Sequence, residues 1–234
     1  MQTRRLDAVL CKSWSAIKKN WDKVTASASA RSVHDLRVAL RRLIVLMEVL
    51  DVLTDVKGIS KQGRALKKLQ DRLGPLRDID VQLRLATQGD IAMLHGFIDY
   101  LKEERAKERQ LAVKRMRRAR KNKLRNEMTR IRRDAIAQLG KKPARSVRLE
   151  ISRLLGAQAK VLKKRQSEYD PDNAEELHAY RIAVRRLRFF LEAAQAVFPN
   201  IGETRLPALR KEQRRIGAIH DRYLLSSSFQ KWNS

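Results

Sequence analysis

The chain has 234 residues, and its 53 Lys and Arg residues outnumber its 26 Asp and Glu residues, giving a formal net charge of +27. A hydrophobic fraction of 43% excludes a disordered basic tail, and the length is sufficient for one large domain or two smaller ones. No stretch approaches the roughly 20 apolar residues of a membrane-spanning helix. The single cysteine, Cys11, cannot form an internal disulfide, which fits the reducing cytoplasm where we expect the protein. Because of the high positive charge we expect a polyanionic partner.

Helices are predicted along almost the whole chain, because apolar residues recur at spacings of three and four and alternating, strand-like runs are missing. In chain order they cover residues 4–22, 31–54, 60–73, 78–87, 91–138, 145–168, 174–198, 204–216 and 219–231. Ser32 and either Asp172 or Asn173 are candidate N-caps, and Gly74 and Gly217 are expected to end helices with a positive φ angle. The sequence therefore predicts an all-α fold.

The sequence contains an internal repeat. Residues 34–43 (HDLRVALRRL) recur as residues 178–187 (HAYRIAVRRL), 144 positions later. Residues 66–78 (LKKLQDRLGPLRD) recur as residues 209–221 (LRKEQRRIGAIHD), 143 positions later. Two motifs in one order at nearly one spacing indicate a tandem duplication.

The duplication divides the chain into residues 1–140 and residues 141–234. The first part is expected to form one helical bundle that includes a long basic helix. The second part is expected to lack a counterpart of the helix predicted at 91–138, because only 13 residues follow Asp221. The predicted architecture is therefore two tandem antiparallel helical bundles, of which the second is truncated.

Each copy carries a cationic stripe on the first repeated helix, since residues three and four apart share one helix face. The stripes are His34, Arg37 and Arg41 in the first copy, and His178, Arg181, Arg185 and Arg188 in the second. Beside them run apolar stripes, Leu36, Leu40, Leu43 and Met47 in the first copy and Tyr180, Val184, Leu187 and Leu191 in the second, which are expected to face the core. Aligned cations repel each other unless an anion neutralises them, and guanidinium groups suit phosphate oxygens. The alternative is a solvated face, or ion pairs with Glu48 and Glu192.

A second basic feature is the segment 102–133, which holds 15 Lys and Arg residues against 4 acidic ones. It is either a binding surface or a solvated helix face. An imperfect apolar seam indicates that one side of this segment packs against the protein. The seam consists of Leu111, Val113, Met116, Leu124, Met128, Ile131 and Ile136.

No motif for catalysis or metal binding is found, because HExxH, CxxC, SxxK and GxSxG patterns are all missing. Asp78 and Asp221 occupy matching positions in the two copies and could act as general bases. No partner nucleophile or second carboxylate recurs beside them, so we interpret them as residues at helix N-termini or as partners of arginines. We expect neither an enzyme nor a cofactor or metal site.

The two HxxRxxxRRL helices and the two QxxLG-type turns resemble the CHAD family, the conserved histidine α-helical domain. The resemblance covers nearly all of the chain. It implies two four-helix bundles related by pseudo-twofold symmetry, a basic central surface that binds inorganic polyphosphate, and an association with polyphosphate granules. No ExExK strand motif precedes the helices, so the triphosphate tunnel domain often fused to this family is not expected.

The resemblance also implies which residues bind polyphosphate. The helices with the namesake residues carry His34, Arg37, Arg41, Arg42, His178, Arg181, Arg185, Arg186 and Arg188. The third helix of each copy adds Lys67, Lys68, Arg72, Lys211, Arg214 and Arg215, and the first helices add Lys18, Lys19, Lys160 and Lys164.

The leading hypothesis is thus non-catalytic binding of inorganic polyphosphate. A nucleic-acid-binding protein that uses the same basic surface is the alternative, and a scaffold that docks an acidic protein is a third. With only 12 aromatic residues, the chain offers few of the platforms on which bases stack. Because family members continue into a further long helix, a second copy of the chain could complete the second bundle.

Overall fold

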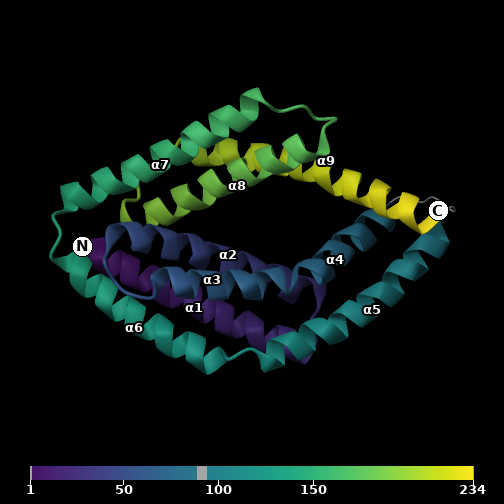
Figure 1. Ribbon diagram of the computed structural model, residues 1–234, viewed down its shortest axis with the longest axis horizontal. Helices are drawn as coiled ribbons and strands as arrows, with labels where there is room; N and C mark the ends of the chain where they lie inside the picture. The colour runs from purple at the N-terminus through teal and green to yellow at the C-terminus, as the bar shows by residue number, and fades with distance from the viewer. Residues whose placement is uncertain (1, 89–93, 234) are drawn as a thin grey trace.

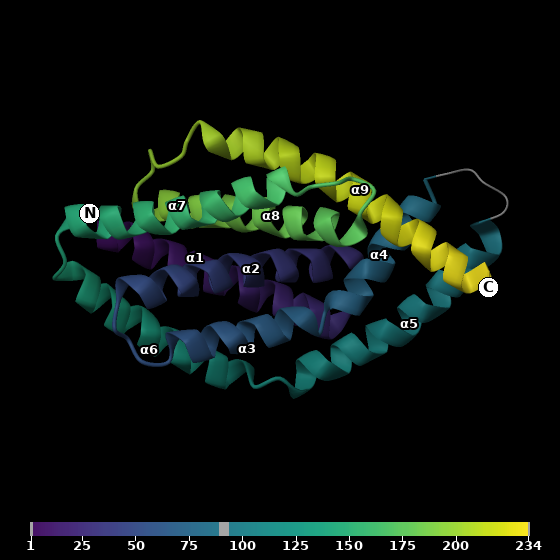
Figure 2. The same cartoon turned by 45° about the horizontal axis from the view of Figure 1, so that its top comes forward.

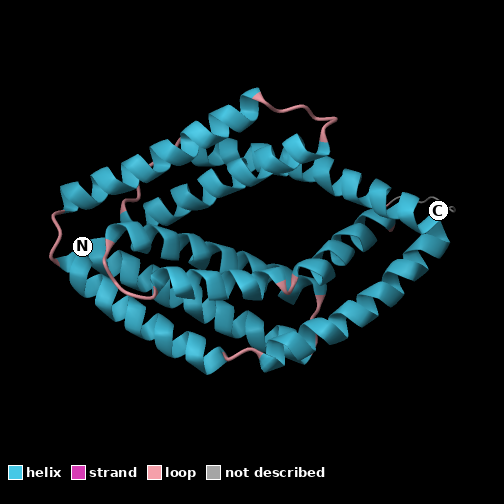
Figure 3. Ribbon diagram, in the orientation of Figure 1, coloured by secondary structure: helices cyan, strands magenta, loops and turns pink. Residues whose placement is uncertain are grey.

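The computed structural model describes residues 2–88 and 94–233, which form α-helices and no β-strand (Figure 1). The first six helices are α1 (Gln2–Ala26), α2 (Ala30–Leu53), α3 (Ile59–Asp71), α4 (Gly74–Ala86), α5 (His95–Arg118) and α6 (Lys121–Gly140). The second copy of the repeat supplies α7 (Ala144–Ser167), α8 (Ala174–Val197) and α9 (Arg205–Asn233). Short loops join most of these helices (Figure 3). The predicted all-α fold is confirmed.

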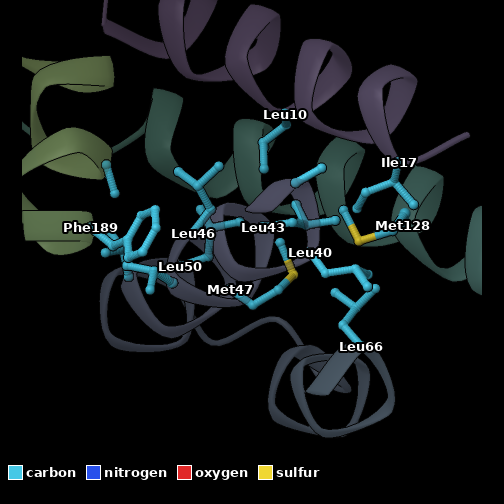
Figure 4. Packing of buried hydrophobic residues seen from close by; sticks show 14 of the residues in the cluster. Leu10, Ile17, Leu40, Leu43, Leu46, Met47, Leu50, Leu66, Met128 and Phe189 are labelled. Atoms are coloured by element: carbon cyan, nitrogen blue, oxygen red, sulfur yellow. The ribbon is translucent and has the colours of Figure 1, made fainter. Parts of the chain in front are cut away.

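The main hydrophobic core is built around α2, which packs between α1 and α3. The predicted apolar stripe of this helix is buried, with Leu36, Leu40 and Leu43 wholly inaccessible to solvent. Figure 4 shows how this stripe meets Leu10 and Ile17 of α1. The cationic stripe of α2 is left on another face of the helix, which is the condition for a binding surface.

The matching helix α8 contacts two hydrophobic cores. Phe189 and Phe190 pack into the main core, next to Leu50 of α2 (Figure 4). Tyr180 and Val184 pack instead with residues of α7 and α9 in a second core. Because α8 belongs to both cores, it fixes the second copy against the first.

A third, smaller core closes the far end of the molecule. Phe97 of α5 meets the rings of Phe229 and Trp232 from α9, with ring centroids 5.4 and 5.6 Å apart. In addition, the side-chain amide of Gln82 on α4 donates a hydrogen bond of 2.8 Å to the hydroxyl of Ser228. The two copies therefore touch at both ends, through α2 and α8 and through α4, α5 and α9 (Figure 2).

The prediction of one continuous basic helix at 91–138 is wrong. Its first positions, residues 91–93, lie outside the described residues, and the remainder forms α5 and α6 with a break at Ala119 and Arg120. Ala119 has the extended angles φ −73° and ψ 137°. The break lets α5 follow α4 and α1 while α6 follows α1 and α3, so that Met116 and Ile131 both reach the core. Leu111 of the predicted seam is instead exposed.

The two helices predicted at 204–216 and 219–231 are one continuous helix, α9. In the first copy, the matching residues form α3 and α4, which meet at a bend, and α4 begins at Gly74 rather than at residue 78. The difference follows from Pro75, which cannot donate a backbone hydrogen bond and whose ring would clash with the preceding turn. The second copy has Ala218 at this position, which leaves the helix intact.

The expected positive φ angles of Gly74 and Gly217 are also wrong, since the positive-φ glycines in the described residues are Gly58 and Gly202. Gly74 is the first residue of α4 and Gly217 lies inside α9, so neither ends a helix. Ser32 is not an N-cap, because Ser29 caps α2 and accepts a hydrogen bond from the Ser32 amide. Asn173 caps α8, as predicted.

No helix in the described ranges is long and apolar enough to cross a membrane. The division into bundles 1–140 and 141–234 stays a prediction.

Substituting Leu43→Ala tests the central role of α2. The change leaves a cavity in a fully packed site, so the free energy of unfolding should fall by about 3 kcal/mol in urea denaturation. Val52→Ala on the same helix is the matched control, because Val52 is half exposed and its loss should change the free energy by less than ~0.5 kcal/mol. Equal effects would show that the main core is not centred on this helix.

Candidate functional site

The cationic stripes of α2 and α8 open into one shared cavity of about 550 Å³, which we call the central cavity. The stripes converge because α2 and α8 pack against each other with their apolar faces turned to the cores (Figure 1). Polar groups of α4 and α9 form the rest of the wall. The charged and polar residues that line it are His34, Arg37, Arg41, Arg77, Asp78, Gln82, His178, Arg181, Arg185, Gln213, His220 and Asp221.

Arg41 and Arg185 occupy matching positions in the two copies and line the same cavity, where the charge of Arg185 acts on Arg41. Burial, together with the neighbouring guanidinium groups, lowers the pKa of Arg41 to about 9 and that of Arg185 to about 10. Both values lie above neutral pH, so both side chains stay charged. Neither forms an ion pair within the described part of the chain, and the guanidinium of Arg41 lies 5.6 Å from the ring centroid of Phe189. The charges of Arg41 and Arg185 are therefore not neutralised by an ion pair with a carboxylate.

The side chain of Arg37 is held by a hydrogen bond to the backbone. Its Nη1 donates a hydrogen bond of 2.6 Å to the backbone carbonyl of Gln70, near the C-terminal end of α3, where carbonyl groups lack helical partners. Burial lowers the pKa of Arg37, while Asp78 and Asp71 partly offset that effect. The contact anchors this arginine at the edge of the cavity.

The histidines add groups that can gain charge. Nδ1 of His178 lies 3.3 Å from Nε2 of His220, so the two rings share a hydrogen bond or repel each other when both are protonated. Desolvation, followed by His220 and the adjacent arginines, lowers the pKa of His178. Desolvation and Arg77 lower the pKa of His34, against a smaller opposite effect of Asp35. In both cases the surroundings of the imidazole favour its neutral form.

Asp78 is the carboxylate on the α4 wall of the cavity. Desolvation raises its pKa, and the charges of Arg37 and Arg181 act in the opposite direction. Its counterpart Asp221 lies on the α9 wall, 3.9 Å from Nδ1 of His220. The interpretation of these two residues as partners of cations agrees with this placement.

Arg42 and Arg186 do not line the central cavity and form crossed ion pairs between the two helices. Arg186 of α8 binds Glu48 of α2 at 2.6 Å, and Arg42 of α2 lies 3.7 Å from Glu192 of α8. Because Arg42 matches Arg186 and Glu48 matches Glu192, each copy gives the other the same pair. Glu192 also accepts a hydrogen bond of 2.8 Å from Arg188. For Arg42, Arg186 and Arg188 the structure therefore shows the alternative given by the sequence, ion pairs with Glu48 and Glu192.

The other residues that the resemblance assigned to polyphosphate lie outside the lining of the central cavity. Lys68 and Arg72 line a different cavity beside α3. Arg215 pairs with Glu212 at 2.7 Å, and Lys164 lies 3.7 Å from Glu168. The remaining positions are exposed side chains that do not line the cavity, namely Lys18, Lys19, Lys67, Lys160, Lys211 and Arg214.

Arg77 and His220 line the central cavity but were missed by the sequence reasoning. They occupy matching positions in the second repeated motif, directly before Asp78 and Asp221. The repeat therefore contained the signal, but the pair is Arg in one copy and His in the other, so identity alone did not reveal it. In the described ranges, no group of three or more His, Cys, Asp and Glu residues is placed to hold a metal ion.

Comparison with known proteins gives one family and one solved fold. The family model of the CHAD domain matches residues 8–230. The crystal structure of the CHAD domain from the plant Ricinus communis is similar, with a TM-score of 0.77 and 22% identity over 99% of this chain and 79% of that one. At this identity the likeness shows the fold. A comparison with curated protein sequences gives no match.

Glu192 should be the carboxylate that matters most around the contact of α2 and α8, because Arg42 from the first copy and Arg188 and Arg210 from the second all lie within 4 Å of it. Replacing it by glutamine leaves three cations without their shared anion in a partly buried site. The free energy of unfolding should fall by about 2 kcal/mol, between the values for exposed and buried pairs.

The matched control is Glu168→Gln, which removes an exposed carboxylate near Lys164 and Arg165. Its effect in the same urea titration should stay below ~1 kcal/mol. If the two variants unfold alike, the crossed pairs do not hold α2 and α8 together.

Proposed function

Since the match over residues 8–230 shows that this chain belongs to the CHAD family, we propose that it binds inorganic polyphosphate in the central cavity without catalysing a reaction. The observation that carries the proposal is the pair Arg41 and Arg185, two partly buried guanidinium groups in one cavity with no carboxylate partner among the described residues. Their repulsion is a cost to the folded chain that an anion between them would remove. Guanidinium groups also donate paired hydrogen bonds to phosphate oxygens.

A linear polyanion suits the cavity better than a single phosphate. The cavity-lining His34, Arg37 and Arg41 of α2 span about 10 Å along the helix axis, and α8 repeats the pattern. A chain of phosphates would contact successive cations of both helices at once. A single phosphate would contact the residues at one position along the two helices and leave the charges at the other positions unpaired.

The lining of the central cavity favours polyphosphate over single-stranded nucleic acid. Its side chains are charged, polar or aliphatic, with no Phe, Tyr or Trp among the described residues that line it. Proteins that bind single strands commonly stack the bases on aromatic side chains. Polyphosphate has no bases and needs only cations and hydrogen-bond donors.

The double variant Arg41→Gln with Arg185→Gln should weaken the binding of long-chain polyphosphate at least about 100-fold, because each lost charge-assisted hydrogen bond is worth about 1.5–3 kcal/mol. Isothermal titration calorimetry at fixed ionic strength measures the effect. The variant should fold normally, since the change removes charge from a crowded cationic site.

The matched control is Arg153→Gln with Lys163→Gln, which removes the same charge from exposed positions of α7. It should leave the affinity within about threefold, as screened surface charges contribute little. Equal loss in both variants would mean that net charge alone binds the polymer. Displacement of polyphosphate by duplex DNA or RNA at equal phosphate concentration would favour the alternative function, nucleic-acid binding.

Acidification should strengthen polyphosphate binding. The pKa values of His34 and His178 are lowered in the free protein, and a bound phosphate chain favours the protonated rings, so binding takes up protons. Affinity should therefore rise about tenfold between pH 7.5 and pH 5, as the pH falls through the two imidazole pKa values.

The double variant His34→Gln with His178→Gln should flatten this dependence while keeping the affinity at pH 7.5. Protonation of Asp78, whose pKa is raised, would add to the increase only at the acidic end. A pH dependence that is unchanged in the double variant would remove both histidines from the site.

A further inference from the structure

A second basic cavity, of about 610 Å³, lies between α3 and the break that separates α5 from α6, and we call it the elbow cavity. None of the residues that line it lines the central cavity. Half of its cationic lining comes from the basic segment 102–133, which has no counterpart in the second copy. Its cationic lining residues are Lys57, Lys61, Lys68, Arg72, Arg118, Arg120, Lys123 and Arg130.

Most of this charge is unneutralised. Arg130 is paired, since its Nη2 lies 3.0 Å from Glu127 and donates a hydrogen bond of 2.8 Å to the backbone carbonyl of Lys57. The other seven cations form no ion pair with any residue that the structure describes. Seven unpaired cations around one concave surface repel each other, and an anion with several charges would relieve that repulsion.

Backbone groups add to the positive potential. Gly58 is the N-cap of α3 and Arg120 is the N-cap of α6, and both residues line the elbow cavity. Neither N-cap has a side-chain hydrogen bond to the first turn of its helix. The positive ends of two helices thus lie at the same cavity as the seven cations.

Part of the lining is apolar, which distinguishes the elbow cavity from a purely anionic site. Ala65 and Leu69 of α3 lie on one side, and Ala119 and Leu124, which flank the break, lie on the other. An inorganic phosphate chain has no apolar group to cover these side chains. A ligand that uses the whole cavity needs several negative charges and a flat or apolar body.

We propose that the elbow cavity binds a nucleoside polyphosphate, with its phosphates among the unpaired cations and its base over the apolar side chains. The volume lies within the range of small-molecule sites, roughly 300–1,000 Å³. The proposal gives a role to the α5–α6 break, because the extended backbone at Ala119 turns the ends of both helices toward α3. It does not depend on the central cavity, and it can be tested independently of polyphosphate binding there.

The test is a calorimetric titration of the full chain with ATP, and in parallel with tripolyphosphate, at matched ionic strength. Arg118→Gln with Lys123→Gln should weaken ATP binding at least about tenfold, since two charge-assisted contacts are lost. The central-cavity variant Arg41→Gln with Arg185→Gln should leave ATP binding within about threefold.

The apolar contribution is tested by Ala65→Leu, which fills the space above α3 without changing the charge or the helix propensity much. It should weaken ATP binding more than tripolyphosphate binding. The proposal is overturned if ATP does not bind at millimolar concentration, or if the central-cavity variant loses ATP binding while the elbow variant keeps it. Equal affinity for ATP and tripolyphosphate in the Arg41→Gln with Arg185→Gln variant, in which the central cavity should no longer bind a phosphate chain, would overturn the assignment of a nucleoside.

Discussion

The repulsion between Arg41 and Arg185 is the constraint on which the rest of the structure depends. Two charged, partly buried groups can face one cavity only if other contacts hold α2 and α8 together. Phe189 and Phe190 supply the apolar part, because they insert into the main core beside α2. The crossed pairs of Glu48 and Glu192 supply the ionic part on the opposite side of the same helices. These apolar and ionic contacts therefore offset the repulsion between the arginines in the cavity.

The two copies of the repeat share this central arrangement and differ in how they enclose it. The bend at Pro75 separates α3 from α4, while the matching residues of α9 run straight to the aromatic contact with Phe97. The bend brings Arg77 and Asp78 to the cavity wall opposite α9. It also leaves α3 beside the α5–α6 break, where the elbow cavity forms. Pro75 thus divides the first copy's counterpart of α9 into two helices, so that α4 lines the central cavity and α3 lines the elbow cavity.

The sequence was sufficient to predict the all-α fold, the buried stripe of Leu36, Leu40 and Leu43, and the stripe residues that line the central cavity. Periodicity and repetition are local signals, and these features depend on them. The break at Ala119 could not be predicted, because it has no Gly or Pro and results from packing of both halves on α1. Which arginines face the cavity was also hidden. Arg188 lies on the predicted stripe of α8, yet it pairs with Glu192 and does not line the cavity, and such a pairing is not visible in the helical periodicity.

The crossed pairs have a further consequence for how the molecule is assembled. Contacts in which Arg42 meets Glu192 while Arg186 meets Glu48 are reciprocal, as in the isologous interface of a twofold dimer. Here both partners belong to one polypeptide, so the interface forms at fixed stoichiometry and does not dissociate on dilution. Each half is also free to change on its own, which a symmetric homodimer forbids, since there every substitution occurs twice. The exchange of proline for alanine between positions 75 and 218 is a change that only a covalently joined pair can carry on one side.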